Sequence, residues 1–345
     1  MTHTRETLKF DTGNAIFSKD YIKKSGHQKS YNTLVIEYLA EIIPSLFPLN
    51  NELSILDLCC GDGSATSKLL DVLLSKNINI KNITGYDISP EQIEIATNYT
   101  KENPCLTFEV MDVEKIDEQN RYDIVISLFG FHWLEQIQNL VPRIHRALKP
   151  EGTVMFLVPL EKEELFNLRQ QCMFSPSWAG YFEGYILHPF HYSSLDYMEP
   201  FTEYFSPESG SISGEGLKKF TKEEFSKFLG SWLQEERYLR LKFGQQIAQQ
   251  YIKNLVDNIQ ESYCERAYLS RDEDQTIQFI ERYLFWQGKR KLEPSKTNEL
   301  VNVPPLTPLQ SSLTKNYIGF FNPKTFQQME NNNIPALTPL QKSLC

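Results

Sequence analysis

A regular alternation of short apolar segments with amphipathic ones, between residues 53 and 158, is the feature that most constrains the fold. The apolar segments are typical of strands buried on both faces, and the segments between them carry apolar residues at helical spacing. We predict strands over 53–58, 83–88, 106–110, 122–128 and 153–158, and helices over 31–49, 64–76, 91–103 and 135–148. Strands that alternate with helices favour a doubly wound, mostly parallel α/β sheet.

The alternation stops after Pro159, and the composition changes twice in the rest of the chain. The first stretch is rich in aromatic residues and indicates an irregular, largely helical cap, followed by helices over 221–233 and 244–263 and a late strand over 276–286. From residue 292 on, Asn, Pro, Ser, Gln and Thr dominate, which is typical of a tail. We expect four parts. Residues 1–50 form an N-terminal helical segment that contributes to a substrate pocket, and residues 51–160 form a binding core. Residues 161–291 form the cap and the end of the domain, and residues 292–345 form a Pro-rich tail.

The net charge and the cysteine content argue against nucleic acid, metal ions and disulfide bonds. The formal net charge of −9 disfavours the phosphate backbone of nucleic acid. The six cysteines show no paired spacing, so we expect no metal site and no disulfide framework, and free thiols indicate a cytoplasmic protein. We also expect no signal peptide and no membrane span, because no apolar run reaches the ~18 residues that a span requires.

The first predicted strand runs into a glycine-containing loop, Cys59-Cys60-Gly61-Asp62-Gly63, before the next helix. Glycines at such a turn let the backbone approach a ligand closely. Cys59 stands where a dinucleotide-binding loop has its first glycine, and Asp57 places an acid directly before the loop. An acid there suits a cationic ligand such as S-adenosylmethionine better than a pyrophosphate.

Further candidate residues follow the ends of the next strands. Asp87 ends the second strand, where an acid in this type of fold binds the hydroxyls of a ribose. Asp112 follows the third strand, where its carboxylate can accept from an adenine amino group. Open α/β sheets bind ligands at the carboxyl ends of their strands, so we expect these acids to share one site.

In this combination the chain resembles the class I S-adenosylmethionine-dependent methyltransferases, over about Ile55–Val158. The resemblance implies a Rossmann-like, mostly parallel seven-stranded sheet and S-adenosylmethionine as cofactor. It assigns Asp57, Cys59, Gly61 and Gly63 to the methionine part of the cofactor, and Asp87 with Ile88 to its ribose. It assigns Asp112 and Val113 to the adenine, and it adds Ser127 and Leu128 at the end of the fourth strand to the cofactor site.

Within that class the chain is similar to the juvenile hormone acid and trans-aconitate methyltransferases, which esterify small carboxylic acids. The similarity rests on Gln28 near the N-terminus, on Trp133 after the fourth strand and on the aromatic cap. It implies that Gln28 and Trp133 hold the substrate carboxylate, for which an amide and an indole N–H are suitable donors. A carboxylate is already ionised at neutral pH, so its methylation requires no general base.

Two alternatives remain open. His132 could act as the base if the acceptor were a hydroxyl or an amine. The tail also holds a repeat, with residues 304–313 recurring as 335–344 and identical at eight of ten positions. The leucines have the same spacing in both copies, since Leu306, Leu309 and Leu313 recur as Leu337, Leu340 and Leu344. This shared spacing favours docking of the repeats to a partner or to the catalytic domain itself.

Overall fold

A computed structural model describes residues 26–47, 51–134, 137–160, 163–185, 194–208, 212–263 and 277–292. The chain forms two compact units, which are taken in turn below. The first, unit 1, consists of Met1–Gly130 and Pro142–Val154, and the second, unit 2, of Phe131–Val141 and Met155–Cys345. The segment 189–193 of the predicted cap and both copies of the tail repeat lie outside the described residues.

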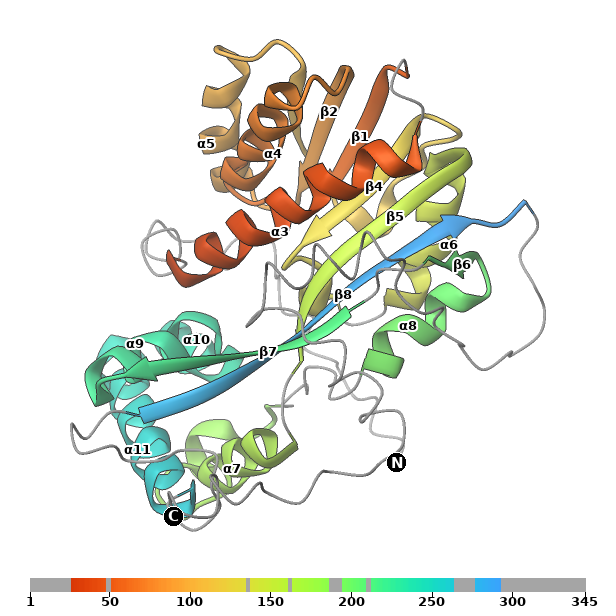
Figure 1. Ribbon diagram of the computed structural model, residues 1–345. Coiled ribbons are helices and arrows are strands. Elements are labelled where there is room, and N and C mark those ends of the chain that lie inside the picture. Colours follow the sequence, from red (N-terminus) through yellow and green to blue (C-terminus); the bar gives the residue numbers. More distant parts are fainter. Residues whose placement is uncertain are drawn as a thin grey trace, which may run out of the picture. The chain divides into compact units, whose positions relative to one another are not determined.

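Unit 1 contains the predicted alternation of strands and helices (Figure 1). Its elements are α3 (Gly26–Leu46), β1 (Leu53–Leu58), α4 (Ser64–Ser75), β2 (Ile80–Asp87), α5 (Pro90–Thr100), β3 (Leu106–Val110), the short η1 (Val113–Lys115) and β4 (Tyr122–Leu128). Two further elements, α6 (Ile137–Ala147) and β5 (Leu148–Leu160), begin in one unit and end in the other.

The strands of unit 1 follow the order β3-β2-β1-β4-β5, and β1 pairs in parallel with both β2 and β4. All six residues of β1 are buried, as expected for a central strand covered on both faces. The helix α5 packs on β2 and β3, and α3 packs on α4. Ser89 caps the N-terminus of α5, and Pro90 lies in its first turn, where a proline is well tolerated.

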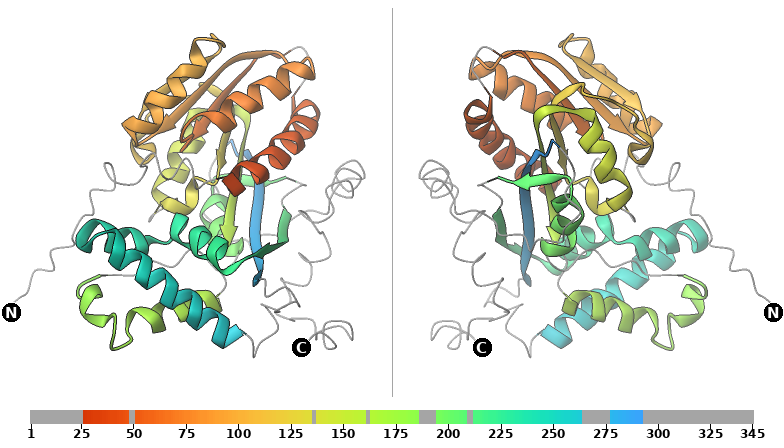
Figure 2. Two further views of the ribbon diagram at one scale, coloured as in Figure 1. Left: turned by 90° about the vertical axis from the view of Figure 1, so that its left-hand side faces the viewer. Right: turned by 90° about the vertical axis from the view of Figure 1, so that its right-hand side faces the viewer.

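Unit 2 joins an antiparallel ribbon to a group of helices. Its elements are η2 (Phe131–Trp133), α7 (Glu163–Met173), η3 (Ala179–Phe182), α8 (Ser194–Thr202), β6 (Phe205–Pro207), β7 (Ile212–Phe220), α9 (Lys222–Trp232), α10 (Gln234–Phe243), α11 (Gln245–Tyr263) and β8 (Ile277–Arg290). The strand β8 lies between β5 and β6 in the strand order and pairs antiparallel with β6 and β7. The views of Figure 2 show α7, α9, α10 and α11 gathered together, and their buried side chains form one apolar cluster.

The predicted α/β fold is confirmed, and β1, β3 and β4 begin and end at the predicted residues. The seven strands β3-β2-β1-β4-β5-β8-β6 form a continuous order, and β7 adds to β8 beside it. A capping box begins α9, since Glu224 N donates to Thr221 Oγ1 (3.2 Å) and Thr221 N donates to Glu224 Oε2 (2.8 Å). Of the helices that the structure describes, none is long and apolar enough to cross a membrane.

Candidate functional site

The loop between β1 and α4 has a left-handed backbone at alternate residues. The φ angles are 61° at Cys59, 57° at Gly61 and 71° at Gly63. A Cβ on Gly63 would lie 2.8 Å from the Cβ of Ala96, so this position requires glycine for space as well as for conformation. Cys59 adopts the same conformation at a cost of about 1–2 kcal/mol, which is typical of backbone held in place by a ligand site.

Asp87, at the end of β2, holds this loop in place. Its Oδ2 accepts from the backbone N–H of Gly61 (2.9 Å), and its Oδ1 accepts from the backbone N–H of Ser89 (2.9 Å). Burial raises the pKa of the Asp87 carboxyl, and these backbone donors lower it. Each carboxylate oxygen has a second lone pair, so Asp87 keeps the capacity to accept from a bound diol.

Asp57, near the end of β1, is a buried acid directly before the loop. Its Oδ2 accepts from Thr66 Oγ1 at 2.6 Å. Burial raises the pKa of Asp57 to about 7, while the hydrogen bond from Thr66 lowers it. A nearby positive charge would favour the ionised form, so the site suits a cationic ligand.

The residues after β2 and β3 combine a partly exposed apolar side chain with a carboxylate. Ile88 is 37% exposed at the end of β2, which leaves an apolar side chain beside Asp87. Asp112 caps η1 by accepting from Glu114 N (3.1 Å) and forms an ion pair with Lys115 (2.8 Å), and Val113 is buried. An apolar side chain and a carboxylate that follow neighbouring strands fit the face and the amino group of a purine.

The end of β4 is fastened to the same loop. Ser127 Oγ donates to the carbonyl oxygen of Leu58 at 2.9 Å, and Leu128 is buried next to it in the chain. Gly130 follows, and a Cβ there would lie 2.5 Å from Ser127 Oγ and 2.6 Å from the Cβ of Cys59. Glycine at this position therefore permits the chain after β4 to lie directly against the loop.

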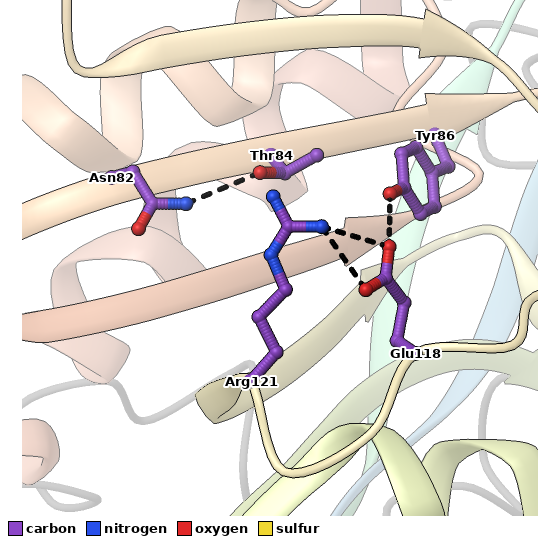
Figure 3. Close-up of polar contacts among 5 residues, drawn as sticks. All are labelled: Asn82, Thr84, Tyr86, Glu118 and Arg121. Atoms are coloured by element: carbon purple, nitrogen blue, oxygen red, sulfur yellow. Dashed lines mark hydrogen bonds and ion pairs between the residues drawn. The ribbon is translucent and has the colours of Figure 1, made fainter.

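A polar network ties the end of β2 to the connection between β3 and β4 (Figure 3). Tyr86 Oη donates to Glu118 Oε1 (2.6 Å), and Arg121 Nη1 donates to Glu118 Oε1 (3.1 Å) and Oε2 (3.0 Å). Tyr86 precedes Asp87, and Glu118 follows the turn that begins at Asp112. The network therefore positions the strand ends that carry the two acids.

The three residues predicted to handle the methyl acceptor lie on other elements. His132 and Trp133 form η2 in unit 2, with ring centroids 4.9 Å apart. His132 is buried, which lowers its pKa to about 3, and Trp133 is half-buried. Gln28 is the third residue of α3, and its side chain lies outside the described part of the structure.

The predicted cofactor residues all belong to unit 1 and lie at or just after the carboxyl ends of β1, β2, β3 and β4. Direct contacts join the loop to Asp87 and β1 to Ser127. Thr66 and Gly130 also belong to this site, although the sequence analysis did not single them out. The hydroxyl residue three positions after Gly63 and the glycine two positions after β4 were the available signals in the sequence.

Comparison with known proteins identifies the core of the chain. Residues 55–152 match the methyltransferase domain family. The chain is 26% identical over 150 residues to a malonyl-[acyl-carrier protein] O-methyltransferase of Priestia megaterium, covering 41% of this chain and 52% of the relative. It is 24% identical over 150 residues to the juvenile hormone acid O-methyltransferase of Drosophila melanogaster, covering 42% of this chain and 50% of the relative. The match thus spans about half the length of these curated relatives.

The fold has a counterpart among solved structures. The crystal structure of the YcgJ protein from Bacillus subtilis superposes with a TM-score of 0.50 at 15% identity, covering 76% of this chain and 99% of that chain. At that identity the likeness concerns the fold alone. The family match indicates a methyltransferase domain at residues 55–152, and the solved structure agrees with it in fold.

Proposed function

We propose that this chain is an O-methyltransferase that esterifies a small carboxylic acid. The observation that carries the proposal is the match of residues 55–152 to the methyltransferase domain, with relatives that are named for malonyl and juvenile hormone acid substrates. The earlier expectation of a cytoplasmic protein acting on a small molecule, with no nucleic acid as partner, is part of the same proposal.

The strand-end residues of unit 1 are proposed to bind the cofactor. Asp57, Cys59, Gly61 and Gly63 would surround its methionine part, and the buried carboxylate of Asp57 would favour the ammonium group. Asp87 would accept from the ribose hydroxyls, with Ile88 beside it. Asp112 and Val113 would contact the adenine, and Ser127 and Leu128 would form the wall next to the loop.

Gln28 and Trp133 are proposed to hold the acceptor carboxylate by donating from their amide and indole N–H groups. When bound, S-adenosylmethionine supplies an electrophilic methyl group on its sulfonium. The protein then contributes alignment, because an ionised carboxylate oxygen attacks directly and releases no proton. Alignment of this kind is worth at most about 7–11 kcal/mol of the barrier.

The linkage formed in the product tests this proposal. Purified protein is incubated with S-adenosylmethionine labelled in its methyl group and with a panel of small carboxylic acids. A methyl ester releases its label as volatile methanol in mild alkali, whereas a methyl ether or methylamine retains it. Label that resists alkali on every acceptor found would overturn esterification while leaving the methyltransferase assignment intact.

The second candidate function is methyl transfer to a hydroxyl or amine, with His132 as the general base. The position of His132 after β4 favours this candidate. Burial, however, lowers the pKa of His132 to about 3, far from the pH at which a general base works best. At saturating S-adenosylmethionine, we expect the rate on the acid substrate to stay flat between pH ~6 and ~8 and to persist in His132→Ala. Trp133→Phe should raise the acceptor KM and leave cofactor affinity unchanged, since it removes only the indole donor.

A further inference from the structure

Gln92 lies at the beginning of α5, close to the cofactor loop. It is 2% exposed, and its backbone N–H donates to the capping hydroxyl of Ser89 (3.4 Å). On the side of the loop, an ideal Cβ on Gly61 would lie 3.9 Å from Gln92 Oε1. Gly61 is also the residue whose N–H donates to Asp87. The Gln92 amide is thus buried beside Gly61, the loop residue that is joined to Asp87 at the end of β2.

The amide nitrogen of Gln92 is buried and has no hydrogen-bond partner in the described structure. A buried N–H group without an acceptor destabilises a folded protein, because the group loses its hydrogen bonds to water and gains none in return. Such groups are uncommon in folded proteins and call for a specific explanation, of which a ligand is one. A methionine or leucine would fill the same space beside Gly61 without this penalty.

We propose that Gln92 is a cofactor-binding residue whose amide donates to a ribose hydroxyl oxygen of S-adenosylmethionine. The inference rests on the proposed function, in which Asp87 binds the same ribose. A hydroxyl that donates its proton to Asp87 still has lone pairs with which to accept, so the two residues complement each other. The bound cofactor would then supply the hydrogen-bond acceptor that the Gln92 amide nitrogen lacks in the described structure.

The variant Gln92→Met tests the proposal, because it removes the amide donor and nearly preserves the volume of the side chain. We expect the Kd for S-adenosylmethionine to rise about fivefold, as for the loss of one neutral hydrogen bond. The melting temperature of the ligand-free protein should rise by about 2–4 °C, because the unpartnered donor is gone. In turnover, the KM for the cofactor should rise by the same factor while kcat at saturation stays unchanged.

Asn98→Met, on the same helix, is the matched control. Asn98 is exposed and its amide already donates to the carbonyl oxygen of Ile95 (3.1 Å), so the same replacement should neither weaken binding nor raise the melting temperature. Gln92→Leu, which also removes the donor, serves if Gln92→Met does not fold, and its Kd should rise by about the same factor. A merely structural Gln92 would show the opposite sign in stability: a lower melting temperature in Gln92→Met.

Methylthioadenosine separates a ribose contact from a contact with the methionine carboxylate. This probe keeps the ribose and lacks the amino acid part, so a ribose contact predicts the same fivefold difference between wild type and Gln92→Met. A difference that disappears with methylthioadenosine, or an unchanged Kd for S-adenosylmethionine, would overturn the assignment of Gln92. Failure of the wild-type protein to bind S-adenosylmethionine at all would instead refute the proposed function.

Discussion

Asp87 joins the end of β2 to both the cofactor loop and the residue that caps α5. Its two oxygens already accept from Gly61 and Ser89, and the proposed ribose contacts use the remaining lone pairs. We expect Asp87→Ala to weaken S-adenosylmethionine binding at least tenfold in calorimetry, because hydrogen bonds to a charged acceptor are worth roughly 1.5–3 kcal/mol each. Ser89→Ala, which removes only the helix cap, is the control. A folded Asp87→Ala protein with wild-type affinity would contradict the ribose assignment.

Asp57 makes a separate prediction about pH. Its pKa in the folded protein is raised to about 7, so near neutral pH a large fraction of its carboxyl groups are protonated. A bound cation favours the ionised form, so cofactor binding should release a proton and affinity should fall as pH falls through about 7. Calorimetry at neutral pH would show this as a difference in binding enthalpy between phosphate and Tris buffers. In Asp57→Asn the difference should vanish.

The raised pKa of Asp57 also fixes the sign of its effect on stability. The folded protein holds this proton more tightly than the unfolded chain, whose carboxyl titrates near its ordinary value of ~4. The Asp57 contribution to the free energy of unfolding therefore falls as pH rises from ~4 to about 7 and is constant above that. If the difference in stability between wild type and Asp57→Asn did not change over this range, Asp57 would not have the raised pKa.

At the residue scale, the positions of the acids were predictable and their partners were not. Asp57 and Asp87 could be identified because strand ends are visible as the points where apolar segments stop. The hydrogen bond from Thr66 to Asp57 and the burial of Gln92 depend on where α4 and α5 pack, which no local pattern determines. The same holds for the pKa of Asp57, because burial is a property of the assembled sheet.

Within unit 2, a buried ion pair joins α7 to α10. Arg169 Nε and Nη2 donate to Glu235 Oε1 (2.7 Å) and Oε2 (2.8 Å), and both side chains are fully buried. We expect Glu235→Ala to lower the free energy of unfolding by about 3–5 kcal/mol in urea denaturation, because it leaves the Arg169 charge buried without its partner. Glu223→Ala, which removes the exposed partner of Lys227, should change it by less than about 0.5 kcal/mol. Similar losses in both variants would contradict this account.

The elements that the sequence analysis missed are those whose stability comes from distant contacts. The strand β7 contains two glycines and several charges, and it is held by its pairing with β8, more than fifty residues away in the chain. The helix α10 has no side-chain cap and a strongly charged sequence, and it buries Glu235 and Glu236, which an amphipathic pattern assigns to solvent. By contrast, β1, β3 and β4 were predictable to the residue, because strands buried on both faces are marked by local apolar runs.

For the whole molecule, the family match covers the cofactor residues and Trp133, but neither Gln28 nor the aromatic stretch that follows β5. Residues 55–152 include every predicted cofactor residue, whereas Gln28 precedes them and the aromatic stretch of unit 2 follows them. Methyltransferases with similar cores can therefore differ in their acceptors through these flanking segments. The predicted division of the chain at residues 51, 161 and 292 stays a prediction, as does the role of the tail.

The tail provides the last prediction. Two copies of one leucine pattern, Leu306, Leu309 and Leu313 and its repeat at 337, 340 and 344, predict two equivalent docking elements. Replacing the three leucines by alanine in one copy should weaken docking, and replacing them in both should abolish it, as removal of residues 293–345 does. Docking on the catalytic domain would appear as a lower melting temperature or altered activity, and docking on another protein as the loss of a partner in a pull-down. Deletion of the polar stretch 327–333 between the copies is the control and should leave each readout unchanged. If the truncated protein retains its melting temperature, its activity and every partner, the repeats have no docking function and the folded domain alone carries the activity.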